Sequence, residues 1–477
     1  MATLKREFGV LSGMAMVAST QIGSGIFKSP QNVLKLVGDP AQAMAVWCIS
    51  GVAALFGLLC YLEMSLLLQE SGAEYTYLHH GFGSKLAYLL VWAKLVIIKP
   101  VAMATALVTF GDYLFADAIG LEKTLMGDES YETAKRIVAV FSILTITMMN
   151  VFSVRLVKKV QKVFFYCLMF PIVFIITLGL VNMVAPPSSV SRVEYVSPSL
   201  ASDDYDYDEL TESVYEHTDS EINQNSPSSE NTILLTISDY SKAFYMSMWS
   251  YDGWQAMAYA VEEMKNPEKS LPLASIAGTC LVTVIYVLMN QAYLTAIPVH
   301  EMLTSSTVAK KFVEFSLQDY NSPYFSKICS GLITYGVLCA TFNTALANAF
   351  TTGRLTFVAG RHGNLPKFMS FVDLKNNTPS IALWTNCIAV ISVLMLLPPD
   401  FTKLVKVMAF TQWLFHGLSF IALILLRWKM PVGSKYVRPF KVRVVEFNSK
   451  FNTKLEQNIF LTNVFHLVLF LLNVILI

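Results

Sequence analysis

Charged residues are scarce in this sequence. Asp, Glu, Lys and Arg make up only 14% of the 477 residues, against about 25% in soluble domains, and 54% of the residues are hydrophobic. Runs of about 20 apolar residues recur along almost the whole chain, and each is long enough to cross about 30 Å of hydrocarbon. The composition excludes an ordinary soluble domain and predicts an all-α protein in the lipid bilayer. The net charge of +1 gives no sign of a nucleic-acid partner.

Groups that hold metals or perform covalent catalysis are also sparse. The seven cysteines lie in or beside apolar segments and have no spacing suited to zinc or a redox dithiol, so we interpret them as free thiols. No spaced set of His, Cys or carboxylates occupies a cleft-forming loop. We therefore expect no catalytic residues, no metal site and no cofactor. Met1–Phe8 is too short for a cleavable signal peptide before the first apolar segment.

Eleven apolar segments are expected to cross the membrane. Their approximate limits are 8–34, 42–68, 87–116, 136–153, 162–184, 238–261, 272–297, 326–357, 379–398, 402–426 and 458–477. Lys and Arg gather before the first segment and after the fourth, eighth and tenth. Because cytoplasmic loops carry an excess of Lys and Arg, this distribution predicts a cytoplasmic N-terminus.

Two connections differ from the rest in composition. Residues 185–237 are acidic and rich in Ser and Asn, which predicts a solvated external loop without fixed structure. The glycosylation sequon Asn376-Asn377-Thr378 falls in a loop predicted to be cytoplasmic, so we expect it to be unused.

Two of the apolar segments are interrupted at mid-membrane depth. The first contains Gly23-Ser24-Gly25, and each glycine costs about 1 kcal/mol in a helix interior. The sixth contains Tyr251-Asp252-Gly253, where an ionisable group is expensive unless it faces a cavity or a partner. Interruptions at the start of each half of a chain of about ten spans are typical of an inverted-repeat transporter. The repeats are expected at roughly 8–184 and 238–426.

The same interruptions predict a binding site. A broken helix frees N–H groups at one new end and C=O groups at the other, and unwound backbone survives in a membrane only where it lines a polar cavity. The N–H end suits a carboxylate and the C=O end suits an ammonium, so the pair would receive an amino acid backbone. Gly-x-Gly alone is more often a helix-packing face, but packing gives no reason to bury Asp252.

Motifs along most of the chain point to one family. They cover roughly residues 5 to 443 and read IGSGIF (22–27), VWCISGVAALFGLLCYLEM (46–64), ESGAEYTYL (70–78), WAKLVIIKP (92–100), NVFSVRLVKKVQ (150–161), WSYDGW (249–254), EEMKNPEKSLPLA (262–274), FTTGRLTFVAGRHGNLPKF (350–368) and RPFKV (438–442). In these stretches the chain resembles the light-subunit family of heteromeric amino acid exchangers, within the amino acid–polyamine–organocation superfamily. The resemblance implies a LeuT-like 5+5 inverted repeat of ten helices, here with one C-terminal helix in place of the usual two.

The resemblance assigns a role to the first interruption. Ser24 and Gly25, with Gly23 beside them, would bind the α-carboxylate of the substrate. Thr20 and Ile22 would lie close to it.

The second interruption would set the selectivity. Ser250 and Tyr251 would offer carbonyls to the α-ammonium, Trp249 would be an aromatic gate, and Gly253 would complete the break. Ile98-Lys99-Pro100 together with WSYDGW is most similar to the broad-range (b-zero-plus) branch, which exchanges cationic for neutral amino acids. Strictly neutral-selective members carry glycine where this chain has Asp252, whose carboxylate would attract the side chain of Lys or Arg.

Three features depart from the family pattern. The stretch from Tyr61 to Tyr166 lacks the cysteine that joins the family to a single-span glycoprotein subunit, so only a noncovalent partner of that kind remains open. Leu168 aligns with a lysine of the fifth span, which leaves ion or proton coupling open. The motifs end near Arg443, so the core is expected at 1–443 and residues 444–477 form an atypical tail with one apolar segment.

Other polar residues near the spans receive structural interpretations. Asn290, His416 and Lys94 are expected to be interhelical hydrogen-bonding groups or snorkelling ends. Glu63 and the pair Glu262-Glu263 lie near Lys and Arg at cytoplasmic ends, where ion pairs would act in gating.

The sequence therefore predicts a sodium-independent exchanger of cationic and neutral L-amino acids in the plasma membrane, working by alternating access and not an enzyme. One alternative is a neutral-only amino acid or amine carrier of the same fold, in which Asp252 holds a structural hydrogen bond or relays a proton. Another is a membrane amino acid sensor that binds without transporting, which the missing cysteine and the curtailed tail would suit.

Overall fold

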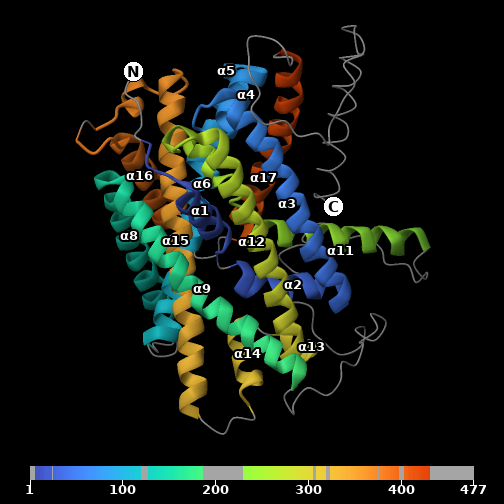
Figure 1. The fold of residues 1–477 in the computed structure, drawn as a ribbon. Helices are drawn as coiled ribbons and strands as arrows, with labels where there is room; N and C mark the ends of the chain where they lie inside the picture. The colour runs from blue at the N-terminus through green and yellow to red at the C-terminus, as the bar shows by residue number, and fades with distance from the viewer. Residues whose placement is uncertain are drawn as a thin grey trace, which may run out of the picture.

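The computed structural model describes residues 6–23, 25–119, 127–185, 229–304, 308–318, 323–373, 375–396 and 402–429. Within these ranges the chain is almost entirely helical (Figure 1). The helices in chain order are α1 (Val10–Gln21), α2 (Gly25–Val37), α3 (Pro40–Leu68), α4 (Glu74–Phe82), α5 (Ser84–Ala93), the π-helical η1 (Lys94–Ile98), α6 (Lys99–Asp112), the π-helical η2 (Tyr113–Ile119), α8 (Asp128–Phe152), α9 (Val154–Val184), α11 (Ser229–Ser250), the 3-10 helix η4 (Ala256–Glu263), α12 (Pro267–Ala296), α13 (Val299–Thr304), α14 (Val308–Ser316), α15 (Pro323–Arg361), the 3-10 helix η5 (Lys367–Ser370), α16 (Ser380–Leu396) and α17 (Thr402–Lys429).

Seven of the described helices are long and apolar enough to cross a membrane. They run over Pro40–Leu68, Ser84–Phe115, Glu129–Phe152, Val154–Val184, Pro267–Ala296, Tyr324–Arg361 and Met408–Lys429. These correspond to seven of the expected segments, and the shorter apolar helix α16 corresponds to an eighth. The first and sixth expected segments are the two that are broken. The all-α membrane class is confirmed, while the expected span at 458–477 and most of the acidic loop lie outside the described residues.

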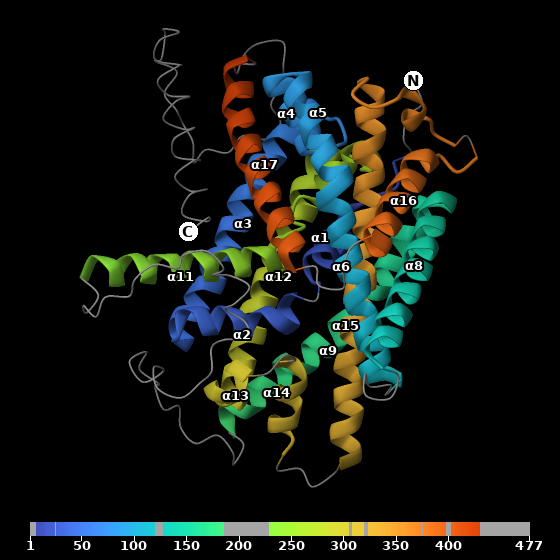
Figure 2. The ribbon, with the colours of Figure 1, turned by 180° about the vertical axis from the view of Figure 1, so that it is seen from behind.

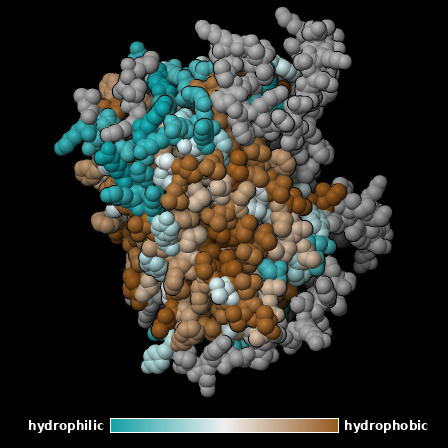
Figure 3. All heavy atoms as spheres, viewed as in Figure 1, coloured by the Kyte–Doolittle hydropathy of each residue, from teal (hydrophilic) through white to brown (hydrophobic). Residues whose placement is uncertain are grey.

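The outer surface of the bundle is apolar, as lipid contact requires. Large side chains such as Phe141 (72% exposed) and Phe170 (66% exposed) point outward from α8 and α9. Hydrophobic residues form a broad continuous area over the face in Figure 3, and hydrophilic residues gather at the end where the N-terminus lies. A patch of this extent would be an aggregation liability in water and marks a membrane surface here.

Helix α1 is the central element. In the opposite views of Figures 1 and 2 it lies inside the bundle, surrounded by longer helices. Nine of its twelve residues are buried, because small and apolar side chains cover every face of the helix. Its contacts are mainly with α12, α9 and α15, so its C-terminal end is fixed at the middle of the protein.

Charge pairs tie the helices together at the end that contains the N-terminus. Arg354 holds the carboxylate of Glu263 through Nε (2.6 Å) and a second nitrogen (3.2 Å), and this pair is fully buried. Arg361 pairs with Glu262 at 2.8 Å, and Arg427 with Glu63 at 2.9 Å. The expectation that these glutamates form ion pairs is confirmed.

Candidate functional site: a cavity between two broken helices

The first helix break separates α1 from α2. Helix α1 ends at Gln21, and Ile22 leaves the helical region with φ −78° and ψ 83°. Helix α2 begins at Gly25, and Ile22 and Gly23 between the two helices have non-helical backbone at the centre of the bundle. Ser24, which the family resemblance assigns to the substrate carboxylate, lies outside the described residues.

The second break follows α11 and touches the first. Gly253 has φ +112°, a conformation that favours glycine, and an added Cβ would lie 2.8 Å from Thr20 Cγ2 and 2.9 Å from the Thr20 carbonyl carbon. A Cβ on Gly25 would in turn meet Ser250 Oγ at 2.8 Å. The glycines at the breaks are therefore required for close approach of the two chains, in addition to ending the helices.

Hydrogen bonds also connect the breaks. The hydroxyl of Tyr286 on α12 lies 2.8 Å from the carbonyl oxygen of Gln21 and 2.9 Å from that of Ser250, so its one hydrogen is shared between the two. Gln21 Nε2 donates to the carbonyl of Tyr251 at 3.1 Å. The carbonyls that the sequence assigned to a substrate ammonium thus already have protein donors, although each oxygen keeps a second lone pair.

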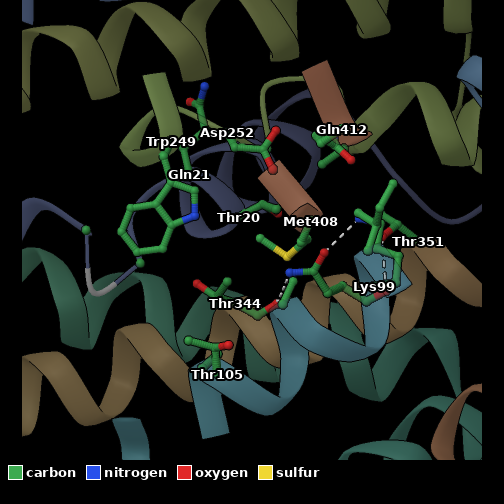
Figure 4. A pocket seen from close by; sticks show the side chains of 18 of the residues that line it. Thr20, Gln21, Lys99, Thr105, Trp249, Asp252, Thr344, Thr351, Met408 and Gln412 are labelled. Carbon is green, nitrogen blue, oxygen red and sulfur yellow. Dashed lines mark hydrogen bonds between the residues drawn. The ribbon is translucent and has the colours of Figure 1, made fainter. Parts of the chain in front are cut away.

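A cavity of about 130 Å³ opens beside the breaks (Figure 4). The sequence-predicted residues that line it are Thr20, Gly23, Gly25, Trp249, Ser250, Asp252 and Gly253. Two others face elsewhere. Ile22 is fully buried in the apolar core, and Tyr251 donates its hydroxyl to the carbonyl of Trp47 at 3.1 Å. These two side chains therefore pack on the side of the breaks that faces away from the cavity.

The opposite walls of the cavity were not predicted. They come from α6, α15 and α17 and include Lys99, Thr105, Thr341, Thr344, Asn348, Thr351, Met408, Gln412 and Trp413. The polar residues of α15 recur every three or four positions, so they form one stripe on an otherwise apolar helix. This spacing of polar residues could have been used to predict, from the sequence, that α15 forms a cavity wall.

The cavity contains both a carboxylate and an ammonium. The side chain of Asp252 is 44% exposed to the cavity and accepts a hydrogen bond from Gln255 Nε2 at 3.0 Å. Lys99 Nζ donates to Asn348 Oδ1 at 2.8 Å and lies 5.4 Å from the ring centre of Tyr259. Figure 4 places Asp252 and Lys99 on different walls of the same space.

A buried polar cluster lies behind Asp252. Lys94 Nζ donates to Glu74 Oε1 (3.2 Å), Tyr259 Oη (3.1 Å) and Gln412 Oε1 (3.1 Å). His416 contacts the hydroxyl of Tyr61 at 2.8 Å. The hydrogen-bonding interpretation of Lys94 and His416 is confirmed, but snorkelling is excluded for Lys94 because its side chain is fully buried. A buried ammonium is tolerated here because three acceptors surround it.

The arrangement has no feature of a metal centre within the part of the chain that is described, where no three His, Cys, Asp or Glu residues are placed to share an ion. It provides instead a small polar space of mixed charge at the middle of a lipid-facing helical bundle, between two broken helices. These are the properties of a multi-pass membrane carrier for a small polar solute.

Comparisons with known proteins define the carrier further. The amino acid permease family model matches residues 8–477, so the match continues beyond the motifs that end near residue 443. The chain belongs to the amino acid permease family.

Relatives from the same comparisons agree with this assignment. The chain is 32% identical to the human b(0,+)-type amino acid transporter 1, over 93% of this chain and 80% of the relative. It is 30% identical to the human large neutral amino acids transporter small subunit 2, over 93% of this chain and 73% of the relative. Among solved structures, MhsT in complex with L-phenylalanine superimposes with a TM-score of 0.54 over 88% of this chain and 89% of MhsT at 12% identity, which supports the fold alone.

Proposed function

We propose that this permease is a sodium-independent exchanger of cationic and neutral L-amino acids. The observation that carries the proposal is Asp252, a carboxylate exposed to the cavity and placed beside the second helix break. A carboxylate exposed to a cavity in the membrane interior attracts a lysine or arginine side chain. The 32% identity to a b(0,+)-type transporter supports the same substrate range.

The backbone of the substrate binds at the first break. Its α-carboxylate lies at the N-terminal end of α2, which begins at Gly25, where backbone N–H groups and the helix dipole favour an anion. Ser24, which the family resemblance assigns to the same carboxylate, precedes Gly25 in the sequence. Its α-ammonium uses the remaining lone pairs of the Ser250 and Tyr251 carbonyls, and Trp249 covers the bound molecule.

Transport follows from movement of the broken-helix pair and its neighbours α3 and α12 against the other helices. The inverted repeats at roughly 8–184 and 238–426 form the two halves of the transporter core. The protein spans the plasma membrane with its N-terminus in the cytoplasm, an orientation that its Lys and Arg distribution favours. A single-span glycoprotein binds it noncovalently; the small-subunit name of one relative supports such a partner.

Counterflow into proteoliposomes tests the proposal. Vesicles containing the full chain and unlabelled leucine and arginine should take up labelled leucine and labelled arginine without sodium. Asp252→Gly should reduce arginine uptake at least tenfold and leave leucine uptake within about threefold, because only the cationic side chain loses its partner.

Asp239→Asn is the matched control. Asp239 also lies on α11, but it pairs with Lys242 at 3.3 Å and lines no part of the cavity, so both uptakes should persist. Intact arginine uptake by Asp252→Gly would exclude Asp252 as the cation site. Binding of both amino acids without counterflow would identify a sensor.

A further inference from the structure

Two lysines of one membrane helix point into the protein. Lys94 and Lys99 are 0% and 7% exposed, although both belong to the apolar segment Ser84–Phe115. In a regular α-helix, side chains five positions apart point about 140° away from each other, so one of the two would face lipid. The π-helical turn η1 prevents this, because the N–H of Lys99 bonds to the carbonyl of Lys94 and the helix widens between them. Lys94 therefore enters the buried cluster with Glu74, and Lys99 enters the cavity.

The ammonium of Lys99 has hydrogen-bonding capacity that the protein does not use. It donates to Asn348 Oδ1 at 2.8 Å, and the orientation of that amide is fixed because Asn348 Nδ2 donates to the Thr344 carbonyl at 3.1 Å. The ring of Tyr259 lies 5.4 Å from Nζ and provides a second, weaker contact. An ammonium has three N–H donors, so Lys99 offers at least one of them to a solute in the cavity.

Asp252 offers an acceptor to the same space. Gln255 Nε2 at 3.0 Å and His416 Nε2 at 3.9 Å both approach Asp252 Oδ1. Among the described residues, none donates a hydrogen bond to Oδ2, and the Asp252 side chain is 44% exposed. Oδ2 is therefore the oxygen that a bound solute can reach.

Asp252 and Lys99 do not neutralise each other by direct contact. The structure describes both side chains and they form no ion pair, so their charged atoms lie more than about 4 Å apart. Figure 4 shows them on different sides of the cavity. A solute between them meets an acceptor on one side and a donor on the other.

We propose that Lys99 and Asp252 together bind the side-chain carboxamide of glutamine, which makes glutamine a preferred neutral substrate of the exchanger. A carboxamide has an N–H2 donor and a carbonyl acceptor on the same carbon. Its N–H2 donates to Asp252 Oδ2 while its oxygen accepts from Lys99 Nζ, so both charged groups gain a partner. An apolar side chain of the same length leaves both without one when it displaces water from the cavity. The inference rests on the proposed exchange function and names a class of neutral substrate for it.

The length of glutamine suits the path from the first break to Lys99. A Cβ on Gly23 would lie 3.3 Å from Thr344 Oγ1, so the break and Thr344 are adjacent. Asn348, which holds Lys99, follows Thr344 by four residues, about 6 Å along α15. A substrate whose backbone binds at the break therefore needs two methylenes before its polar group to approach Lys99.

Three amino acids of similar side-chain length separate the two contacts. Glutamine brings a donor and an acceptor, glutamate brings two acceptors and a negative charge that Asp252 repels, and methionine brings no strong hydrogen-bonding group. Counterflow is measured without sodium in proteoliposomes that contain the full chain and unlabelled leucine. The KM for glutamine should be about tenfold below that for methionine and at least tenfold below that for glutamate.

Variants assign each contact to its residue. Lys99→Met should raise the KM for glutamine about tenfold, close to the methionine value, because the carboxamide oxygen loses its donor. Asp252→Gly should close the gap between glutamine and glutamate, because the repelling carboxylate is gone. Lys242→Met, a change at a lysine of α11 that pairs with Asp239, should keep the substrate order of the unaltered protein.

The carboxamide site and the exchange function fail in different ways. A KM for glutamine in the unaltered protein equal to that for methionine or for glutamate would overturn the carboxamide site, while the exchanger would stand. That comparison needs no variant, so it decides even if Lys99→Met does not fold. A glutamine preference that survives in folded Lys99→Met would overturn the site too. Absence of counterflow for leucine, arginine and all three test amino acids would overturn the exchange function and the carboxamide site together.

Discussion

At the scale of single residues, the cavity is defined by a carboxylate and an ammonium on different walls. The sequence predicted that Asp252 is a site residue, because a charge in a membrane segment is costly unless it faces a cavity or a partner. It assigned no site role to Lys99, which entered only as part of the motif Ile98-Lys99-Pro100 and lies at the start of α6. The structure places Lys99 on the cavity wall, held by Asn348, so the site is less anionic than Asp252 alone implies.

Removing the ammonium should make the site more cation-selective. In Lys99→Met the aliphatic bulk remains and the positive charge is lost, so arginine no longer meets a like charge in the cavity. We expect the KM for arginine in counterflow to fall about threefold to tenfold, with little change for leucine. Lys242→Met removes a lysine of α11 that is 37% exposed and pairs with Asp239, and should change neither value. An unchanged arginine KM in Lys99→Met would show that Lys99 does not act on the substrate.

Residue patterns also explain which parts of the site could be predicted. Glycines and an aspartate in apolar segments are local anomalies, so both breaks were visible in the sequence. The contact of Lys94 with Glu74 and Gln412 joins η1, α4 and α17, and no local pattern specifies such a meeting. The polar stripe of α15 was visible, but only the fold shows that it faces the breaks.

At the scale of elements, α12 holds the two broken helices together. Tyr286 reaches both breaks with one hydroxyl, at 2.8 Å from Gln21 O and 2.9 Å from Ser250 O. The two carbonyls belong to residues 229 positions apart in the chain, and both residues are buried. The sequence predicted where the helices break but not what fixes their relative position.

Loss of this hydroxyl should loosen the breaks. Tyr286→Phe leaves two buried carbonyls without this donor, at a cost of about 1–3 kcal/mol, and should lower both the thermal midpoint and the affinity for leucine. Tyr293→Phe is the matched control on the same helix, because Tyr293 Oη is buried with no hydrogen-bond partner among the described residues. Removing that hydroxyl should leave stability unchanged or raise it. Equal behaviour of the two variants would contradict the role given to Tyr286.

At the scale of the whole molecule, the fold class and nearly all of the spans were predictable from apolar segment length. The bilayer imposes that length on every helix, so the signal is strong in any single sequence. Short elements that lie between the spans, such as α4 and α14, were not predicted as helices. They are too short to cross the membrane, and burial against the bundle stabilises them.

Low pH should lower the stability of the folded protein through groups that lie outside the spans, at the end that contains the N-terminus. Burial lowers the pKa of His79 and of His362, whose rings stack with centres 4.6 Å apart, while a hydrogen bond from His80 lowers the pKa of Glu70. A histidine whose pKa is lowered by folding binds fewer protons in the native state, so its stability contribution is complete above about pH 6.5 and is lost as pH falls below that value. The Glu70 contribution persists to lower pH and is lost below about pH 4.5.

Thermal unfolding of the purified protein in nanodiscs measures this effect. The midpoint should be lower at pH 5.5 than at pH 7.5, and the difference should shrink in the double variant His79→Gln with His362→Gln. His300→Gln should retain the full difference, since this side chain is 77% exposed. A pH difference of the same size in the double variant would assign the acid sensitivity to other groups.

The ion pairs at the N-terminal end have a consequence for the resting state. They join α3 and η4 on one side to α15 and α17 on the other, through Glu63 with Arg427 and through Glu262 and Glu263 with Arg361 and Arg354. Separating these groups at that end requires several charges to be parted at once, and three of them, Arg354, Glu263 and Glu63, are buried. The substrate-free protein should therefore rest in a conformation that is closed at the N-terminal end. Opening at that end should be the slow step of each transport cycle.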